Sequence, residues 1–263
     1  MSDSALFRKS ARQALRGNWQ TALLITFSAG IFGIISNVIQ MRFNLQLTPS
    51  ADWIKIFSEG RRQFSGFQGL FLLLFILDFV FSSALAIGLN YYYLQLHRGR
   101  EAVYSLLFSR IHILSKCLGQ SLLISLYTLG WGAVVFVPFL LIAFLLHGMN
   151  YVLAVIFIIG LACLLMIITY RYAMAPYLMA DHPEMGVMES IRESKRMMDG
   201  QAGRLFGLQL SLIGWGFLAA GITAGLRYIS PVFGTVIGLL CSLILQVYIN
   251  AAFTAFYLDF LNE

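Results

Sequence analysis

Six long stretches of apolar residues constrain this chain more than any other feature of its sequence. A helix rises about 1.5 Å per residue, so about twenty apolar residues cross the roughly 30 Å of hydrocarbon in a bilayer. The runs are continuous and lack the alternation of a barrel wall, which argues against strands. The sequence therefore predicts an all-α, polytopic membrane helix bundle. Its six transmembrane helices are expected near residues 19–39, 67–94, 118–146, 151–172, 205–226 and 229–256.

The composition indicates that lipid is the main solvent of the chain. Of the 263 residues, 59% are hydrophobic and 11% are charged, whereas about 25% of the residues of a soluble domain are charged. No charged or Pro/Ser-rich linker divides the sequence, so residues 1–263 are expected to form a single integral membrane domain. The basic first residues lack the apolar region of a cleavable signal peptide.

The distribution of lysine and arginine predicts the orientation. With both termini in the cytoplasm, thirteen of the eighteen basic residues lie inside and five lie outside. The positive-inside rule favours this arrangement. Its weak point is the outer loop at residues 41–66, which carries four basic residues. The sequence does not determine whether this loop is folded.

A short basic amphipathic stretch precedes each odd-numbered span. The first covers residues 4–18, and the others cover about 103–116 and 187–198. In the first, Arg8, Arg12 and Arg16 form a row at i, i+4 spacing. Such helices usually lie in the interface with the apolar face down and the basic face toward anionic headgroups. We therefore expect short cytoplasmic helices that contact inner-leaflet lipids. The threefold pattern also leads to the hypothesis of three helix-hairpin pseudo-repeats; chance similarity between apolar sequences is the alternative.

Polar residues within the spans are the candidate functional groups. Asp78 is an intramembrane carboxylate, and Arg171, near the inner end of the fourth span, is the cation to consider with it. They could serve an ion or proton pathway, or they could simply pair helices and reach the interface. Asn90, Gln246 and Asn250 are amides that either hold helices together or line a polar path.

The segment Asp181–Glu184 reads as the start of a cytoplasmic helix, because acidic residues and proline suit the first turn. Gly200 suits the end of that helix. An alternative gives the segment a binding role, in which side chains of the helix meet a partner; the candidates are Glu189, Arg192, Glu193 and Arg196.

Motifs of known enzymes are missing from the sequence. The four histidines lack ligand spacing, the three cysteines are far apart, and neither a P-loop nor a nucleophile elbow is present. We therefore expect no enzyme activity, no cofactor and no metal. The net charge of +6 is explained by anionic lipid rather than by nucleic acid.

Several motifs in order along the chain resemble one family. They are Gly17-Asn18-Trp19 after a basic helix, GLNYYYLQLHRG at 88–99, Pro138 after Trp131, and MAPYLMADHPEMGVMESIRESKRMMDGQAGRLF at 174–206 with the run ending at Trp215. Together they resemble the bacterial integral membrane family called domain of unknown function 975. The resemblance implies a multi-pass protein of the bacterial cytoplasmic membrane, and it brings no substrate, reaction or catalytic residue.

Three functions follow as hypotheses. The first is a non-enzymatic protein that organises or senses the membrane, or serves as a membrane subunit of a larger assembly. The second is a small transporter or exporter of a lipid, peptide or other amphiphile, in which Asp78 faces a cavity. An intramembrane enzyme is the third and least supported.

Overall fold

The computed structural model describes residues 3–42, 66–145 and 151–262, and every regular element in these ranges is helical. The outer loop and the turn at 147–150 fall largely outside them. In chain order the elements are α1 (Asp3–Leu15), α2 (Trp19–Arg42), α4 (Gly66–His97), η1 (Tyr104–Leu107), η2 (Ile111–Ile113), α5 (Leu114–Leu145), α6 (Tyr151–Tyr170), α7 (Ala175–Asp181), α8 (Val187–Met197), α9 (Ala202–Ile229) and α10 (Pro231–Asn262). The described residues hold six helices long and apolar enough to cross a membrane, as predicted.

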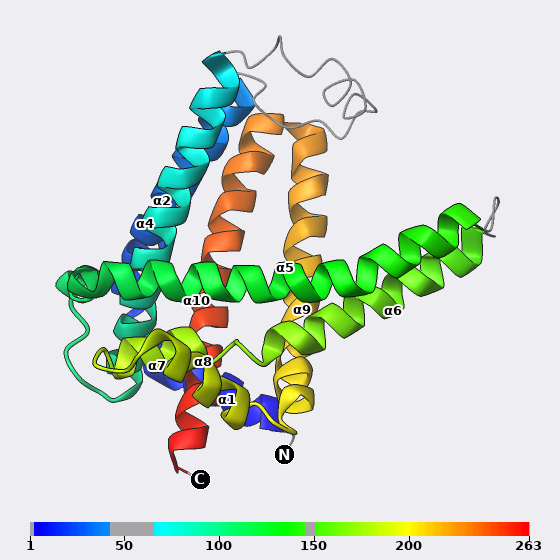
Figure 1. Cartoon of the computed structure of the whole chain (residues 1–263). Coiled ribbons are helices and arrows are strands. Elements are labelled where there is room, and N and C mark those ends of the chain that lie inside the picture. Colours follow the sequence, from blue (N-terminus) through cyan, green and yellow to red (C-terminus); the bar gives the residue numbers. More distant parts are fainter. Residues whose placement is uncertain (1–2, 43–65, 146–150, 263) are drawn as a thin grey trace.

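Four long helices form the body of the bundle. α2 packs on α4, α9 packs on α10, and α10 also contacts α2 and α4 (Figure 1). Large apolar side chains on the outside of these helices are exposed, for example Phe217 at 75%. Apolar exposure of this extent is expected where lipid, rather than water, surrounds the helices.

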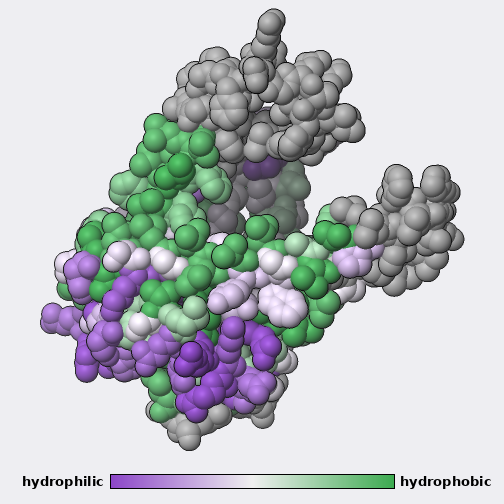
Figure 2. All heavy atoms as spheres, in the orientation of Figure 1, coloured by the Kyte–Doolittle hydropathy of each residue, from purple (hydrophilic) through white to green (hydrophobic). Residues whose placement is uncertain are grey.

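The buried core is concentrated at one end of the bundle, which we call the basal layer. It consists of α1, η1, η2, α7 and α8 together with the adjoining ends of α4, α5, α9 and α10. Its fully buried side chains include Tyr92, Tyr93, Met179, Phe256 and Tyr257. Hydrophilic residues gather over this end, and hydrophobic residues cover the long helices (Figure 2). α1 and the end of α10 both lie in the basal layer, as an even number of crossings requires.

The α5–α6 hairpin lies across the direction of the other four long helices (Figure 1). In the basal layer α5 contacts α4, α7, α8 and η2, and α6 contacts α9. The chain changes direction at residues 171–174, which form turns between α6 and α7. The stretch Tyr151–Asp181 is nearly as long as α4 or α10, so α6 and α7 correspond to one long helix that is broken here.

Two of the three predicted units begin in the same way. α1 leads through Gly17 (φ +86°) into α2, and α8 leads through Gly200 (φ +73°) into α9. Glycine suits both turns because a positive φ is costly for other residues. Gly200 thus ends the α8 segment as predicted.

The second amphipathic stretch differs from the expected helix, since it forms the two 3₁₀ turns η1 and η2 before α5. The close approach of this stretch to α4 gives a physical reason. A Cβ atom on Gly88 of α4 would stand 1.9 Å from the carbonyl oxygen of Leu107. The backbone of η1 therefore packs directly on α4, where a regular amphipathic helix would place side chains.

Candidate functional site: the basal layer

α1 is docked on protein in the basal layer. Phe7, Ala11 and Leu15 on its apolar face are buried against α9 and α10. The Phe7 ring meets Phe256 edge-on at 5.3 Å, and the Tyr248 hydroxyl donates to the Arg8 carbonyl at 3.3 Å. This corrects the expectation that the apolar face of the first helix lies in lipid: aromatic and small side chains of the last helix cover it instead.

The basic face of α1 points away from this contact. Arg12 and Arg16 are exposed and Arg8 is half-buried. The side-chain hydrogen bonds described for them are local: Arg8 Nε donates to the Ser4 carbonyl at 3.3 Å and Arg12 Nε to the Arg8 carbonyl at 3.4 Å. Within the described residues, none of the three forms an ion pair with a carboxylate.

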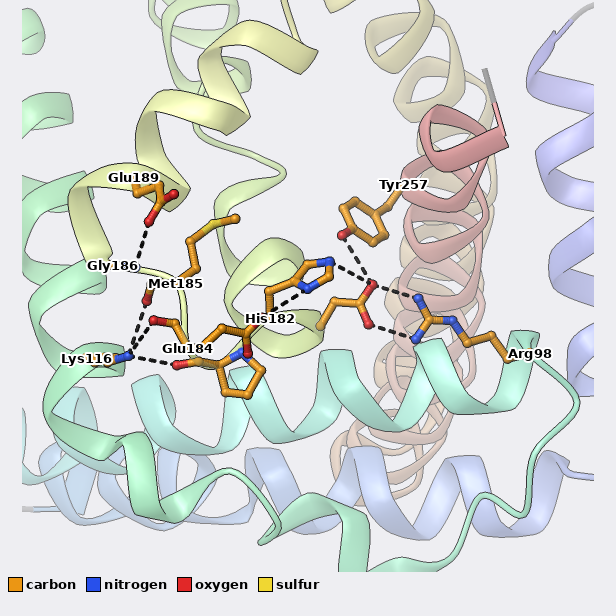
Figure 3. A network of polar contacts seen from close by, with 10 residues as sticks. Arg98, Lys116, His182, Glu184, Met185, Gly186, Glu189 and Tyr257 are labelled. Carbon is orange, nitrogen blue, oxygen red and sulfur yellow. Dashed lines mark hydrogen bonds and ion pairs between the residues drawn. The ribbon is translucent and has the colours of Figure 1, made fainter.

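Other basal cations are held by acids or carbonyls. Arg98, which follows α4, makes a bidentate pair with Asp181 at the end of α7, at 2.7 and 2.6 Å (Figure 3). The Tyr257 hydroxyl of α10 reaches the same carboxylate at 3.5 Å. The hydrogen bond to Asp181 raises the pKa of the Arg98 guanidinium. One carboxylate thus connects the ends of α4, α7 and α10.

Lys116, in the first turn of α5, binds the turn between α7 and α8 (Figure 3). Its Nζ donates to the carbonyl oxygens of Pro183, Glu184 and Met185 at 2.8, 3.2 and 3.3 Å. An ammonium group has three donors and suits three carbonyls that no helix satisfies. The contact fixes the start of α5 to this turn.

The turn also corrects the predicted helix start. Asp181 ends α7 rather than beginning a helix, and α8 starts at Val187. The Gly186 N–H donates to Glu189 Oε2 at 3.2 Å and completes the start of α8 (Figure 3). The carboxylate of Asp181 is instead taken by Arg98, a partner 83 positions away in the chain.

The side chains of α8 that sequence singled out have different surroundings. Glu189 is used in the helix start described above. Glu193 and Arg196 form an ion pair at 2.6 Å, and the hydrogen bond from Arg196 lowers the pKa of the Glu193 carboxyl. Arg192 is exposed, and the described residues offer it no acidic partner. Of the four candidates, Arg192 is thus the one left open to an external ligand.

Buried polar side chains hold the break between α6 and α7. Ser194 Oγ donates to the Arg171 carbonyl at 2.9 Å and accepts from the Met174 N–H at 3.2 Å. Gln120 Nε2 donates to the Ala175 carbonyl at 2.9 Å and to Ser190 Oγ at 2.8 Å. Breaking a helix frees backbone groups that are costly to bury without partners. Ser194 and Gln120 supply such partners and Ser190 holds Gln120 in place, so the break is a built feature of the fold.

The intramembrane candidates do not form one site. Asp78 Oδ1 lies 3.4 Å from the position that a Cβ on Gly33 of α2 would take. Arg171 is exposed at the α6–α7 break, and no ion pair joins it to Asp78 in the described part of the chain. Gln246 Nε2 donates to Asn250 Oδ1 within α10 at 3.1 Å, while Asn90 is half-buried on α4.

Comparison with known proteins shows which family the chain belongs to. Its residues 1–263 match a family described as "Protein of unknown function (DUF975)". The chain belongs to the DUF975 family. No curated protein and no solved structure matches it. The family resemblance read from the sequence motifs is therefore confirmed over the whole chain, and it carries no assigned activity.

The basal layer of this DUF975 member contains a tyrosine from each hairpin that sequence analysis did not select. Tyr93 of α4, Tyr177 of α7 and Tyr257 of α10 are all buried, and each precedes a leucine. The Tyr93 hydroxyl bonds Thr26 of α2 at 2.8 Å, and the Tyr177 ring stacks on Tyr257 at 5.6 Å. The recurrence of Tyr-Leu at the end of each hairpin is the sequence signal that could have identified them, and it favours the three-unit hypothesis.

Proposed function

We propose that this DUF975 protein is a non-enzymatic protein of the bacterial cytoplasmic membrane that binds and organises anionic lipids of the inner leaflet. The observation that carries the proposal is the division of the basal cations into two sets. Arg98, Lys116 and Arg204 bind carboxylates or carbonyls of the chain itself, whereas Arg8, Arg12 and Arg16 present their charge outward on a docked, fixed helix. Cations near an anionic leaflet contribute about 1 kcal/mol each.

The orientation belongs to the same proposal. The basal layer faces the cytoplasm, with both termini inside, because most lysine and arginine residues of the chain lie on the segments that build it. A protein partner could bind the same face, which would make the chain a membrane subunit of a larger assembly.

The test is recovery of lipid with the protein in native-lipid nanodiscs, followed by mass spectrometry of headgroups and co-purifying proteins. The triple variant R8Q/R12Q/R16Q should lose much of the enrichment in anionic lipid. A matched control, R42Q/R61Q/R62Q, removes the same charge from the segments assigned to the opposite side and should retain the enrichment. Equal recovery of anionic lipid from all three proteins would contradict the proposal, and a stoichiometric partner protein would favour the subunit version.

A second candidate function is transport of an amphiphile. The observation that favours it is the broken α6–α7 helix, since discontinuous helices in many transporters mark the binding region. This version needs Asp78 to face a water-accessible path. In a variant whose native cysteines are replaced by serine, Asp78→Cys should then react with a water-soluble maleimide, and a residue sealed against α2 would not react.

A further inference from the structure

A cation is held over two stacked tyrosines at the base of the α5–α6 hairpin. The rings of Tyr127 in α5 and Tyr172 at the break are parallel, with centroids 5.8 Å apart and planes 7° apart. Lys195 Nζ of α8 lies 5.0 Å and 5.2 Å from the two ring centroids. The described residues give Lys195 no carboxylate, so its charge is positioned by the rings yet remains uncompensated.

Two further cations are neighbours of this site: Arg171 is adjacent to Tyr172 in the chain, and Arg192 lies near Lys195 on α8. Arg171 directly precedes Tyr172, and its carbonyl is fixed by Ser194 of α8. Arg192 is three positions before Lys195, and residues at i, i+3 share a helix face. The negative charges of the segment are already engaged, Glu189 at the start of α8 and Glu193 with Arg196. The base of the hairpin therefore carries net positive charge.

An apolar groove begins beside these rings. It has a volume of about 760 Å³ and runs along the side of α5 that faces α6; its lining includes Ile124, Leu129, Gly132 and Phe136 of α5, and Leu165 of α6. Ile124 belongs both to the groove and to the apolar cluster formed by Tyr172, Ala175 and Ile191 under α8. The groove and the cations are thus two ends of one surface.

The size of the groove suits an acyl chain. From Ile124 to Val137 it follows α5 for roughly 20 Å at 1.5 Å per residue. One leaflet accounts for about half of the roughly 30 Å hydrocarbon thickness, so an acyl chain of ordinary length fits along it. A ligand that satisfies both ends has an anionic headgroup and a hydrocarbon chain.

We propose that the base of the α5–α6 hairpin is a specific binding site for one anionic phospholipid. The headgroup lies at Lys195, Arg192 and Arg171, and one acyl chain lies in the groove between α5 and α6. The site deepens the proposed function and rests on it, because both require the basal layer to face anionic lipid. It adds a single saturable site to the general attraction exerted by α1.

Trp131, next to Gly132 of the groove, offers a direct measurement. In nanodiscs of zwitterionic lipid, the fluorescence of a W19F/W53F/W215F protein is followed while dibrominated phosphatidylglycerol or dibrominated phosphatidylcholine is titrated in. We expect quenching by dibrominated phosphatidylglycerol to saturate at about a tenfold lower mole fraction than quenching by dibrominated phosphatidylcholine. The comparison is the variant R192Q/K195Q, which lacks two of the three cations and in which the two curves should coincide.

Two control pairs keep the outcome interpretable. R42Q/R227Q removes the same charge from the side of the molecule assigned to the outside and should leave the Trp131 curves unchanged. Gly132→Leu fills the groove, whereas Gly160→Leu enters open space on α6; a Cβ at either glycine meets no atom within 4 Å, so both should fold. Only Gly132→Leu should reduce the preference for the anionic lipid.

The proposal fails if the two lipids quench Trp131 alike in the parent protein, or if R192Q/K195Q keeps the preference. Either result would leave the proposed function standing if the nanodiscs of R8Q/R12Q/R16Q still lose anionic lipid. Conversely, a preference at Trp131 without any effect of the α1 variant would support this site and contradict the role given to α1.

Discussion

At the scale of the residue, the same side-chain type has two different uses in the basal layer. Arg98 makes two short bonds to a carboxylate whose side chain is 8% exposed. Arg204 likewise joins α9 to Asp259 of α10 at 2.6 Å and lies over the ring of Phe7. These arginines connect helices, whereas Arg12, Arg16 and Arg192 are exposed. Charge counts along the sequence cannot distinguish the two groups, because the acidic partner is distant in the chain.

Gly88 gives the first prediction at this scale. Gly88→Ala should lower the apparent melting temperature in detergent, because the new Cβ would meet the Leu107 carbonyl at 1.9 Å and force the backbones apart. Overpacking of this kind costs about 1–3 kcal/mol. The control is Gly30→Ala in α2, where a Cβ meets nothing within 4 Å. Equal melting temperatures for the two variants would show that η1 does not pack on α4 as described.

At the scale of the element, the broken second helix of the middle hairpin is the main departure from regularity. α4 and α10 run without interruption from the far end of the bundle into the basal layer, whereas α6 stops at Tyr170 and α7 resumes at Ala175. α7 stays in the core through Tyr177 and Asp181, and α5–α6 is free to take another direction. Ser190, Ser194 and Gln120 make the break stable, since each is buried and bonded.

Ser194→Ala tests the break. Removing the hydroxyl leaves the Arg171 carbonyl and the Met174 N–H without their partner, which costs about 1–3 kcal/mol. Hydrogen exchange of the backbone at residues 171–175 should therefore accelerate about tenfold or more. Ser211→Ala is the matched control, because that hydroxyl bonds only the Leu208 carbonyl of its own helix. Unchanged exchange at 171–175 would remove Ser194 from the role assigned to it.

At the scale of the whole molecule, the fold is a lipid-exposed bundle closed at one end. Buried side chains are concentrated in the basal layer, where segments from both ends of the chain meet, and the long helices keep much of their surface exposed. The stability of the fold therefore depends on the basal contacts more than on packing along the spans.

The orientation is tested on a background without native cysteines. Single cysteines replacing Gln13 in α1 and Asn262 at the end of α10 should resist a membrane-impermeant maleimide applied to intact cells, and they should react after the cells are opened. A cysteine at Met149, in the turn assigned to the outside, should react in intact cells. Labelling of Gln13→Cys before lysis would reverse the proposed orientation.

Much of the architecture was predictable because apolar runs report helices directly. The long apolar segments, the amphipathic first helix and the turn at Gly200 all follow from local sequence. The break at 171–174 has only Pro176, in the first turn of α7, as a local signal, and the side chains that satisfy its backbone lie on α5 and α8. Local sequence predicts a helix start at Asp181 for a similar reason: capping explains an acidic residue before a proline, whereas its partner Arg98 is remote in the chain.

The docking of α1 has a consequence for how the protein is made. The surface that covers the apolar face of α1 is contributed largely by α9 and α10, which are synthesised long after α1. At 5–20 residues per second, the N-terminal helix waits on the order of tens of seconds for its binding surface. During that interval its apolar face has only the membrane interface to cover it. A chain truncated before α10 would lack Phe256 and Tyr248 and would leave part of this apolar face exposed, which is the kind of surface by which chaperones and proteases recognise incomplete copies.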